Sequence, residues 1–117
     1  DRIRRENAAM LRNASIGIAF TRDRRFQRVN PYFERMLGWP PGSLEGQSGA
    51  VVWPDEQAYA DVSAAIGPAL SEGRAVDIER LIRRRDGSLF LCRILAQALD
   101  PADRIHGGTI WICEDVT

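Results

Sequence analysis

The sequence predicts a single α+β domain, with one antiparallel sheet and helices on one of its faces. Three observations predict this class. Apolar and polar residues alternate near both ends of the chain, in 16–29 and 75–116, as they do in half-buried strands. Between these segments, apolar residues recur at helical spacing. The length of 117 residues fits one domain with one hydrophobic core.

The N-terminal residues 1–14 are predicted to form a flanking helix, and 15–117 the domain itself. Ile3 and Met10 give the helix only a thin apolar stripe, which suits a helix that lies on a surface or pairs with a second copy. Because the chain is helix-like at its start and ends on a good N-cap, Thr117, we expect both ends to be cuts through helices of a longer protein.

A hairpin is expected next. Ile16, Ile18 and Phe20 alternate with small or polar residues, and a polar turn at 23–25 separates them from a second apolar segment, 26–29. This order of strand, polar turn and strand is typical of two antiparallel neighbours.

Two main helices are predicted in the middle of the chain. Asn30 is a favourable N-cap, Pro31 suits the first helical position, and Gly38 is placed to end the helix. A longer helix is expected over 55–72, because Asp55 begins it with a carboxylate at its positive end and apolar residues follow at helical spacing.

Three strands are predicted after the long helix, over 75–84, 88–99 and 108–116. Asp86–Gly87 predicts a two-residue hairpin turn between the first two. The segment 100–107 is expected to be a loop.

The strand 88–99 has two different faces, and its uncharged face should point inward. That face consists of Phe90, Cys92, Ile94 and Ala96. The other face consists of Leu89, Leu91, Arg93 and Leu95, which is too apolar for a fully wet surface. We expect it to lie under the N-terminal helix or against a second subunit.

Composition and charge exclude several classes of function. The chain has 44% hydrophobic residues and a formal net charge of zero, so we predict no nucleic-acid partner and no membrane contact by this domain. Local arginine clusters are interpreted as solvated surface, with a partner contact as the alternative. The sequence has no apolar run near the roughly 20 residues that cross a bilayer, and no signal peptide. Cys92 and Cys113 lie in apolar strands, so buried reduced thiols and a cytoplasmic location are predicted, including the cytoplasmic part of a membrane-anchored receptor.

Four segments in order along the chain resemble a PAS domain. They are NASIGIAF, RVNPYFERMLGW, RRRDGSLF and GGTIWICEDVT, the last of which ends in Asp115-Val116-Thr117 and matches the D-[IV]-T exit motif of the family. The pattern is most similar to bacterial PAS domains that accompany diguanylate cyclase, phosphodiesterase or histidine kinase output domains.

The resemblance implies a five-stranded antiparallel sheet of order 2-1-5-4-3, with helices over one face and a pocket between that face and the long helix. It places Thr109, Trp111 and Cys113 inward. It also implies a homodimer through the N-terminal helix and the outer sheet face, for which the candidate interface residues are Ile3, Met10, Leu91 and Leu95.

The pocket is expected either to be filled by side chains or to take a small, mostly apolar metabolite. Tyr59 offers a hydroxyl that could orient a ligand, and packing at the pocket edge is its alternative role. The candidate lining residues are Phe33, Met36, Trp53, Tyr59, Val62, Ile66, Phe90, Ile94 and Trp111.

No cofactor is predicted. Haem-binding relatives use a His in the long helix, whereas 55–72 has none and the one histidine, His106, falls in the predicted loop. Photoactive flavin-binding relatives need a reactive Cys after the first helices, and 40–56 contains none. Trp111 would also occupy space that a flat cofactor needs, although non-covalent flavin stays open.

The sequence gives no sign of an enzyme, because neither Cys nor the single His has the companions of a nucleophile, base or metal set. We therefore expect a sensory domain that binds a small ligand and passes a signal through Asp115, Val116 and Thr117 to a covalently linked output domain. The alternative is a ligandless dimerisation module.

Overall fold

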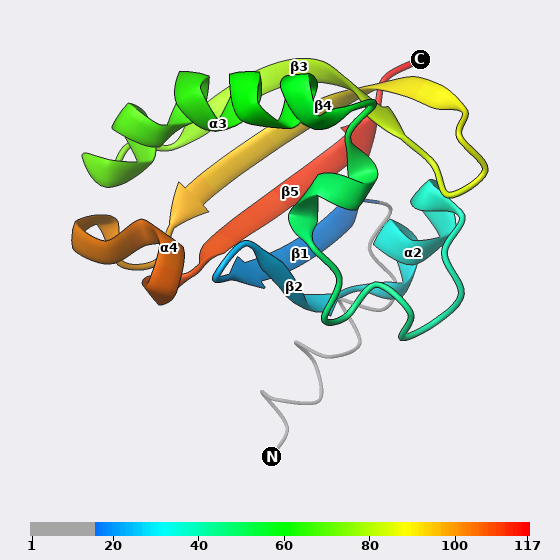
Figure 1. Cartoon of the computed structure of the whole chain (residues 1–117), viewed down its shortest axis with the longest axis horizontal. Coiled ribbons are helices and arrows are strands. Elements are labelled where there is room, and N and C mark those ends of the chain that lie inside the picture. The colour runs from blue at the N-terminus through cyan, green and yellow to red at the C-terminus, as the bar shows by residue number, and fades with distance from the viewer. Residues whose placement is uncertain (1–15) are drawn as a thin grey trace.

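The computed structural model describes residues 16–117, and the predicted flanking helix with Ile3 and Met10 lies outside them. The described chain forms one five-stranded antiparallel sheet with the strand order β2-β1-β5-β4-β3, which confirms the predicted order (Figure 1). The strands are β1 (Gly17–Arg22), β2 (Arg25–Val29), β3 (Val76–Arg83), β4 (Leu89–Ala98) and β5 (Thr109–Asp115). The helices are α2 (Pro31–Leu37), α3 (Glu56–Ser71) and the single turn α4 (Arg104–Gly107).

Helix α2 begins and ends at the residues that the sequence predicts. The Asn30 side chain accepts a hydrogen bond from the Phe33 amide, and Pro31 occupies the first helical position. Gly38 ends the helix in the left-handed conformation, with a φ of 75° that a residue with a Cβ adopts reluctantly. The 3₁₀ turn Gly49–Val52 then leads toward α3.

Helix α3 lies across one face of the sheet, in front of β3 and part of β4 in Figure 1. Asp55 caps it by accepting a hydrogen bond from the Ala58 amide, as expected. Its buried residues are Val62, Ile66, Gly67 and Leu70, which recur at the three- and four-residue spacing of a single helix face. That face therefore packs on the sheet.

The β1–β2 turn consists of Asp23 and Arg24, with φ values of 54° and 62°. Two consecutive left-handed residues give a tight two-residue turn whose twist matches that of the strands. The Asp23 amide donates to the Ile105 carbonyl at 2.9 Å, which ties this turn to α4. Residues about 80 positions apart in the chain therefore lie together at one end of the sheet.

The β3–β4 hairpin differs from the predicted two-residue turn. Arg83 pairs with Leu89, and the Arg84 amide donates to the Ser88 carbonyl at 2.8 Å, so three residues, 85–87, form the loop. Gly87 takes a φ of 92° inside it. Asp86 accepts from the amide and the hydroxyl of Ser88, and these bonds favour the longer loop over the two-residue turn.

The predicted loop at 100–107 contains local helical structure. Pro101–Asp103 forms a 3₁₀ turn and α4 follows directly. Short helical turns of this kind carry no periodic apolar pattern, so the sequence gives them no clear signal.

The two sheet faces divide as predicted from strand 88–99. Phe90, Cys92, Ile94 and Ala96 are buried on the inner face under the helices. On the outer face, Ile18 pairs with Ile112 and Ile112 with Leu95, so apolar residues continue across β1, β5 and β4. Trp111, Cys113 and Thr109 belong to the inner face, in the register that the resemblance implies.

Candidate functional site

A cavity of about 100 Å³ lies between α3 and the inner sheet face. Its apolar lining includes Phe26, Phe33, Trp53, Val62, Ile66, Leu70 and Ile94. These side chains are buried and apolar. The cavity can therefore hold a compact apolar group at little desolvation cost.

Seven of the nine residues that the sequence singled out as ligand-binding line this cavity. They are Phe33, Trp53, Tyr59, Val62, Ile66, Ile94 and Trp111. Whether they bind a ligand stays a prediction.

Met36 and Phe90 do not line the cavity. Met36 lies on the side of α2 that faces β1, where its terminal methyl is 3.0 Å from the position of a Cβ on Gly17. Phe90 lies at the start of β4, under the Arg84 guanidinium, 4.3 Å from the ring centroid. Both face the core, but periodicity shows only that a residue faces inward and not which part of the interior it reaches.

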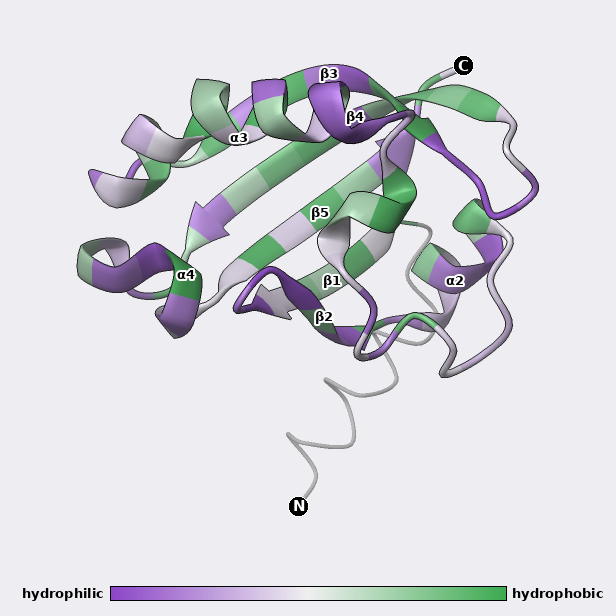
Figure 2. Ribbon diagram, viewed as in Figure 1, coloured by the Kyte–Doolittle hydropathy of each residue, from purple (hydrophilic) through white to green (hydrophobic). Residues whose placement is uncertain are grey.

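The cavity has a polar end that the sequence did not reveal. Arg24 from the β1–β2 turn and Arg104 from α4 line it there, together with Tyr59 and Ser63 of α3. Figure 2 shows the hydrophilic β1–β2 turn beside α4, on the side of the sheet that α3 covers. The hydrogen bond from Asp23 to Ile105 brings these arginines to the same end of the cavity, 80 residues apart in sequence.

Beside this end, His106 and Asp23 form an exposed ion pair, which links α4 to the β1–β2 turn a second time. The hydrogen bond that the His106 ring donates to Asp23, and the negative charge of Asp103, raise the pKa of His106 above its ordinary value. A raised pKa means that the pair stabilises the fold below the ordinary pKa of His, and that this contribution is lost as the pH rises through the folded-state pKa.

Strand β5 supplies Thr109, Trp111 and Cys113 to the cavity wall. The Trp111 indole donates to the Thr21 hydroxyl at 2.8 Å, which fixes the ring against β1. Cys113 is a buried free thiol, and the hydrogen bond with Cys92 and burial raise its pKa well above the ordinary value. Cys113 is therefore a neutral thiol at physiological pH.

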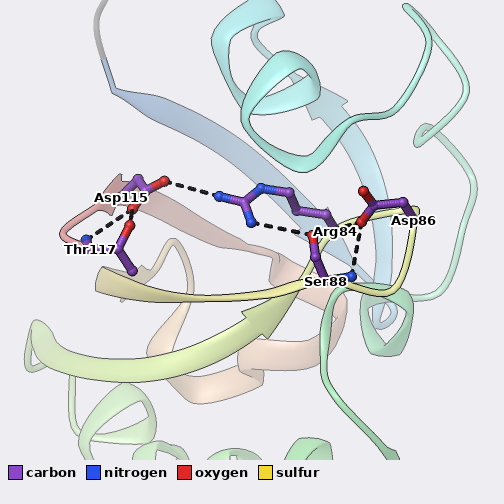
Figure 3. Close-up of polar contacts among 5 residues, drawn as sticks. All are labelled: Arg84, Asp86, Ser88, Asp115 and Thr117. Carbon is purple, nitrogen blue, oxygen red and sulfur yellow. Dashed lines mark hydrogen bonds and ion pairs between the residues drawn. The ribbon is translucent and has the colours of Figure 1, made fainter.

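The chain leaves the sheet at Asp115, Val116 and Thr117, the exit residues. Asp115 accepts hydrogen bonds from the amide and hydroxyl of Thr117, and its other oxygen lies 3.3 Å from Nη2 of Arg84 (Figure 3). These bonds lower the pKa of Asp115, the Thr117 hydroxyl most and the Arg84 charge less. The Val116 amide donates to the Leu91 carbonyl at 3.0 Å, so the exit residues remain attached to β4.

The β3–β4 hairpin holds the other side of this network. Nη1 of Arg84 donates to the Ser88 hydroxyl at 3.3 Å, and that hydroxyl donates to Asp86 at 2.7 Å (Figure 3). The sequence identified Asp115 as an exit residue, but it did not identify Arg84 as its partner. Because Arg84 lies 31 residues earlier, only the pairing of β3, β4 and β5 brings the two charges together.

Within residues 16–117 no three His, Cys, Asp or Glu side chains are grouped to hold a metal ion. Within the same residues no helix has the length and hydropathy to span a membrane. The candidate interface residues Leu91 and Leu95 are half-buried on the outer sheet face.

Comparison with known proteins places these features in context. The chain is 28% identical to the sensor protein TdiS of Thauera aromatica over 108 residues, which are 92% of this chain and 20% of TdiS. The chain therefore spans about a fifth of the length of that relative.

Two solved structures show the same fold. A PAS domain of a LuxR-family transcriptional regulator from Burkholderia thailandensis superposes with a TM-score of 0.85 at 24% identity, covering 92% of this chain and 95% of that one. A domain of a sensor histidine kinase/response regulator from Geobacter sulfurreducens gives 0.73 at 21% identity, covering 98% and 97%.

The family described as PAS fold matches residues 11–117. This match covers all five strands, the cavity between the sheet and α3, and the exit residues. The chain therefore belongs to the PAS family, and it is a sensory PAS domain similar to those of bacterial signalling proteins.

Proposed function

We propose that this domain binds a small ligand in the cavity under α3 and passes the signal through β5 and the exit residues to a covalently linked output domain. The observation that carries the proposal is the position of β5. The strand lines the cavity with Thr109, Trp111 and Cys113, and it ends two residues later at Asp115. A ligand that moves Trp111 or Cys113 therefore acts directly on the strand that leads out of the domain.

The size of the cavity supports a ligand of about one ring or a short branched chain. Its volume of about 100 Å³ is of the order of an engineered protein cavity, roughly 150 Å³, that takes up benzene. This size favours a small metabolite over haem or flavin. The PAS domain from Burkholderia thailandensis was solved in complex with ethanol, which is also a small ligand.

Filling the cavity tests the proposal. We expect Val62→Phe to extend a ring into the cavity from α3 and to abolish the thermal shift that a small-molecule library produces with the parent domain. Ala64→Phe, at an exposed position of the same helix, is the control and should keep the shift. A ligand that stabilises both variants equally would contradict binding in the cavity.

The alternative function is a ligandless dimerisation module, and the apolar outer sheet face favours it. Leu81 and Leu89 are 51% and 48% exposed there, beside the half-buried Leu91 and Leu95. We infer that this face forms a homodimer contact in either case. A domain that dimerises but binds no small molecule would support the scaffold role.

For the output domain we propose only a class of protein domain. The resemblance to receptors with diguanylate cyclase, phosphodiesterase or histidine kinase domains gives three candidates, and similarity to the sensor protein TdiS supports a signalling output of this kind. We propose that the PAS domain regulates such an output from the cytoplasm and has no catalytic activity of its own.

A further inference from the structure

The two arginines at the polar end of the cavity are the starting point. Arg24 and Arg104 both line the cavity, and neither takes part in an ion pair with a carboxylate of residues 16–117. Other arginines within residues 16–117 do form ion pairs with carboxylates. Arg84 pairs with Asp115 at 3.3 Å, and Arg93 pairs with Asp77 at 2.8 Å. Arg104 is also partly buried, and a guanidinium that leaves water without gaining an anion is unfavourable.

Helix α3 makes room for the Arg104 guanidinium at Gly67. A Cβ at position 67 would lie 3.0 Å from Nη2 of Arg104 and 3.4 Å from its Cζ. Gly67 is buried and lies one turn from Ser63, which also lines the cavity. The glycine therefore lets the guanidinium rest against the helix beside the cavity.

The remaining polar groups surround the same end of the cavity. The hydroxyls of Tyr59 and Ser63 line it, and neither has a hydrogen-bond partner within residues 16–117. The Tyr59 hydroxyl and the carbonyl of Arg24 both lie near Gly49, at 3.5 Å and 3.6 Å from the position that a Cβ on Gly49 would take. Two cations and two residues with hydroxyl groups thus line a cavity whose other lining residues are mostly apolar.

We propose that the ligand is a compact monocarboxylate. This inference rests on the proposed function and adds the chemical class of the ligand. Its apolar part, a single ring or a short branched chain, fills the space among Phe26, Trp53 and Ile94. Its carboxylate meets Arg104 at the polar end, with Arg24 as a second, more exposed cation. A planar guanidinium pairs with a carboxylate through two parallel hydrogen bonds, which also orients the ring.

Two matched pairs of compounds test the charge requirement. Benzoate and benzamide have nearly the same shape, as do 3-methylbutanoate and 3-methylbutanamide, and only the acids are charged. Isothermal titration calorimetry gives the affinities, and the shift of the Trp111 indole N–H resonance shows whether a compound enters the cavity. We expect at least one acid to bind about tenfold more tightly than its amide.

Two variants locate the anion. Arg104→Gln removes the charge and should reduce the affinity for the acid about tenfold while leaving that for the amide unchanged. Gly67→Ala keeps the arginine but adds a methyl group that displaces it, and it should have the same selective effect in a helix that tolerates alanine. Arg28→Gln, at an exposed position on β2 outside the cavity, is the control and should change neither affinity.

The outcomes separate this inference from the proposed function. Amides that shift Trp111 as strongly as the acids, or acids that bind Arg104→Gln as well as the parent, would overturn the carboxylate assignment and leave ligand sensing intact. If the two acids, the two amides and the small-molecule library all leave the Trp111 resonance unmoved, the carboxylate assignment and the proposed sensing function both fail.

Discussion

Asn30 illustrates how much one side chain contributes at the scale of a residue. Its Oδ1 accepts from the Phe33 amide at 3.0 Å and from the Ile18 amide at 2.9 Å. Its Nδ2 donates to the Ile16 carbonyl at 3.0 Å. The residue is 6% exposed, so these bonds form away from water. The N-cap follows from the sequence, but the two bonds to the start of the first hairpin do not.

We predict that Asn30→Ala destabilises the domain by about 3 kcal/mol, because it removes a helix cap and leaves a buried amide of Ile18 without a partner. Asn30→Asp keeps the acceptor for both amides but places a carboxylate oxygen beside the Ile16 carbonyl, so it should be less stable than the parent as well. Urea unfolding followed by tryptophan fluorescence measures both changes. A loss below about 1 kcal/mol for Asn30→Ala would mean that the bonds to β1 contribute nothing beyond the cap.

The contact between Arg104 and Gly67, in contrast to the Asn30 cap, could not be predicted from the sequence. In the sequence, Arg104 is one of many arginines and Gly67 precedes a proline. Their meeting depends on α4 packing under the end of α3, 37 residues apart in the chain. Local sequence carries no signal for such a contact.

At the scale of an element, β5 connects the cavity with the exit. Its inner residues contact the cavity, its outer residues belong to the apolar outer face, and Asp115 joins its end to Arg84 at the end of β3. Both ions of this pair are about 30% exposed, so the pair contributes little to stability. The pair instead ties the end of β5, where the chain leaves the sheet, to the β3–β4 hairpin.

We predict that Asp115→Ala leaves the fold and the melting temperature nearly unchanged but uncouples the output of the full-length protein from the ligand. Asp115→Asn keeps an acceptor for the Thr117 amide and loses the charge facing Arg84, so it separates the two interactions. The regulated activity of the full-length protein, with and without ligand, is the measurement.

Glu114→Ala is the matched control, because Glu114 is exposed on the same strand and pairs across the sheet with Arg93. Regulation that survives in Asp115→Ala as it does in the control would remove Asp115 from signal transfer.

At the scale of the whole molecule, the domain has one covered sheet face and one apolar face turned outward. The outer face includes Ile18, Ile110, Ile112, Leu91 and Leu95, with Leu81 directly opposite Leu91 on β3. Apolar side chains gathered on one exposed face mark an interaction site in water. A row of charged residues, Glu79, Arg93 and Glu114, crosses this face between Leu91 and Leu95.

We predict that the parent domain is a dimer and that Leu91→Glu shifts it toward the monomer, because the variant replaces an apolar contact of the outer face, opposite Leu81, with a charge. Leu99→Glu is the control, since Leu99 is 58% exposed and lies after the end of β4. Light scattering over a range of concentrations measures the oligomeric state. A dimer that Leu91→Glu leaves intact would place the interface elsewhere.

The sequence by itself determined the elements of this protein and the direction in which their side chains face. Caps at Asn30 and Asp55, a left-handed glycine at 38 and the alternation in 88–99 are local signals, because they depend on residues a few positions apart. The resemblance of four segments to a PAS domain then implied the sheet order, which the structure confirms. The sequence pattern and the resemblance together also predicted cavity-lining residues such as Trp53, Ile66 and Trp111.

Only the tertiary structure decided which inward residues share the cavity and which charges meet. Met36 and Phe90 face inward but lie away from the cavity, and the three-residue loop at 85–87 replaces the shorter predicted turn. Strand pairing brings Arg84 to Asp115, and the hydrogen bond from Asp23 to Ile105 brings Arg24 and Arg104 to the same end of the cavity, both over long separations in the chain. Such contacts depend on the whole packing arrangement, and no window of neighbouring residues contains that information.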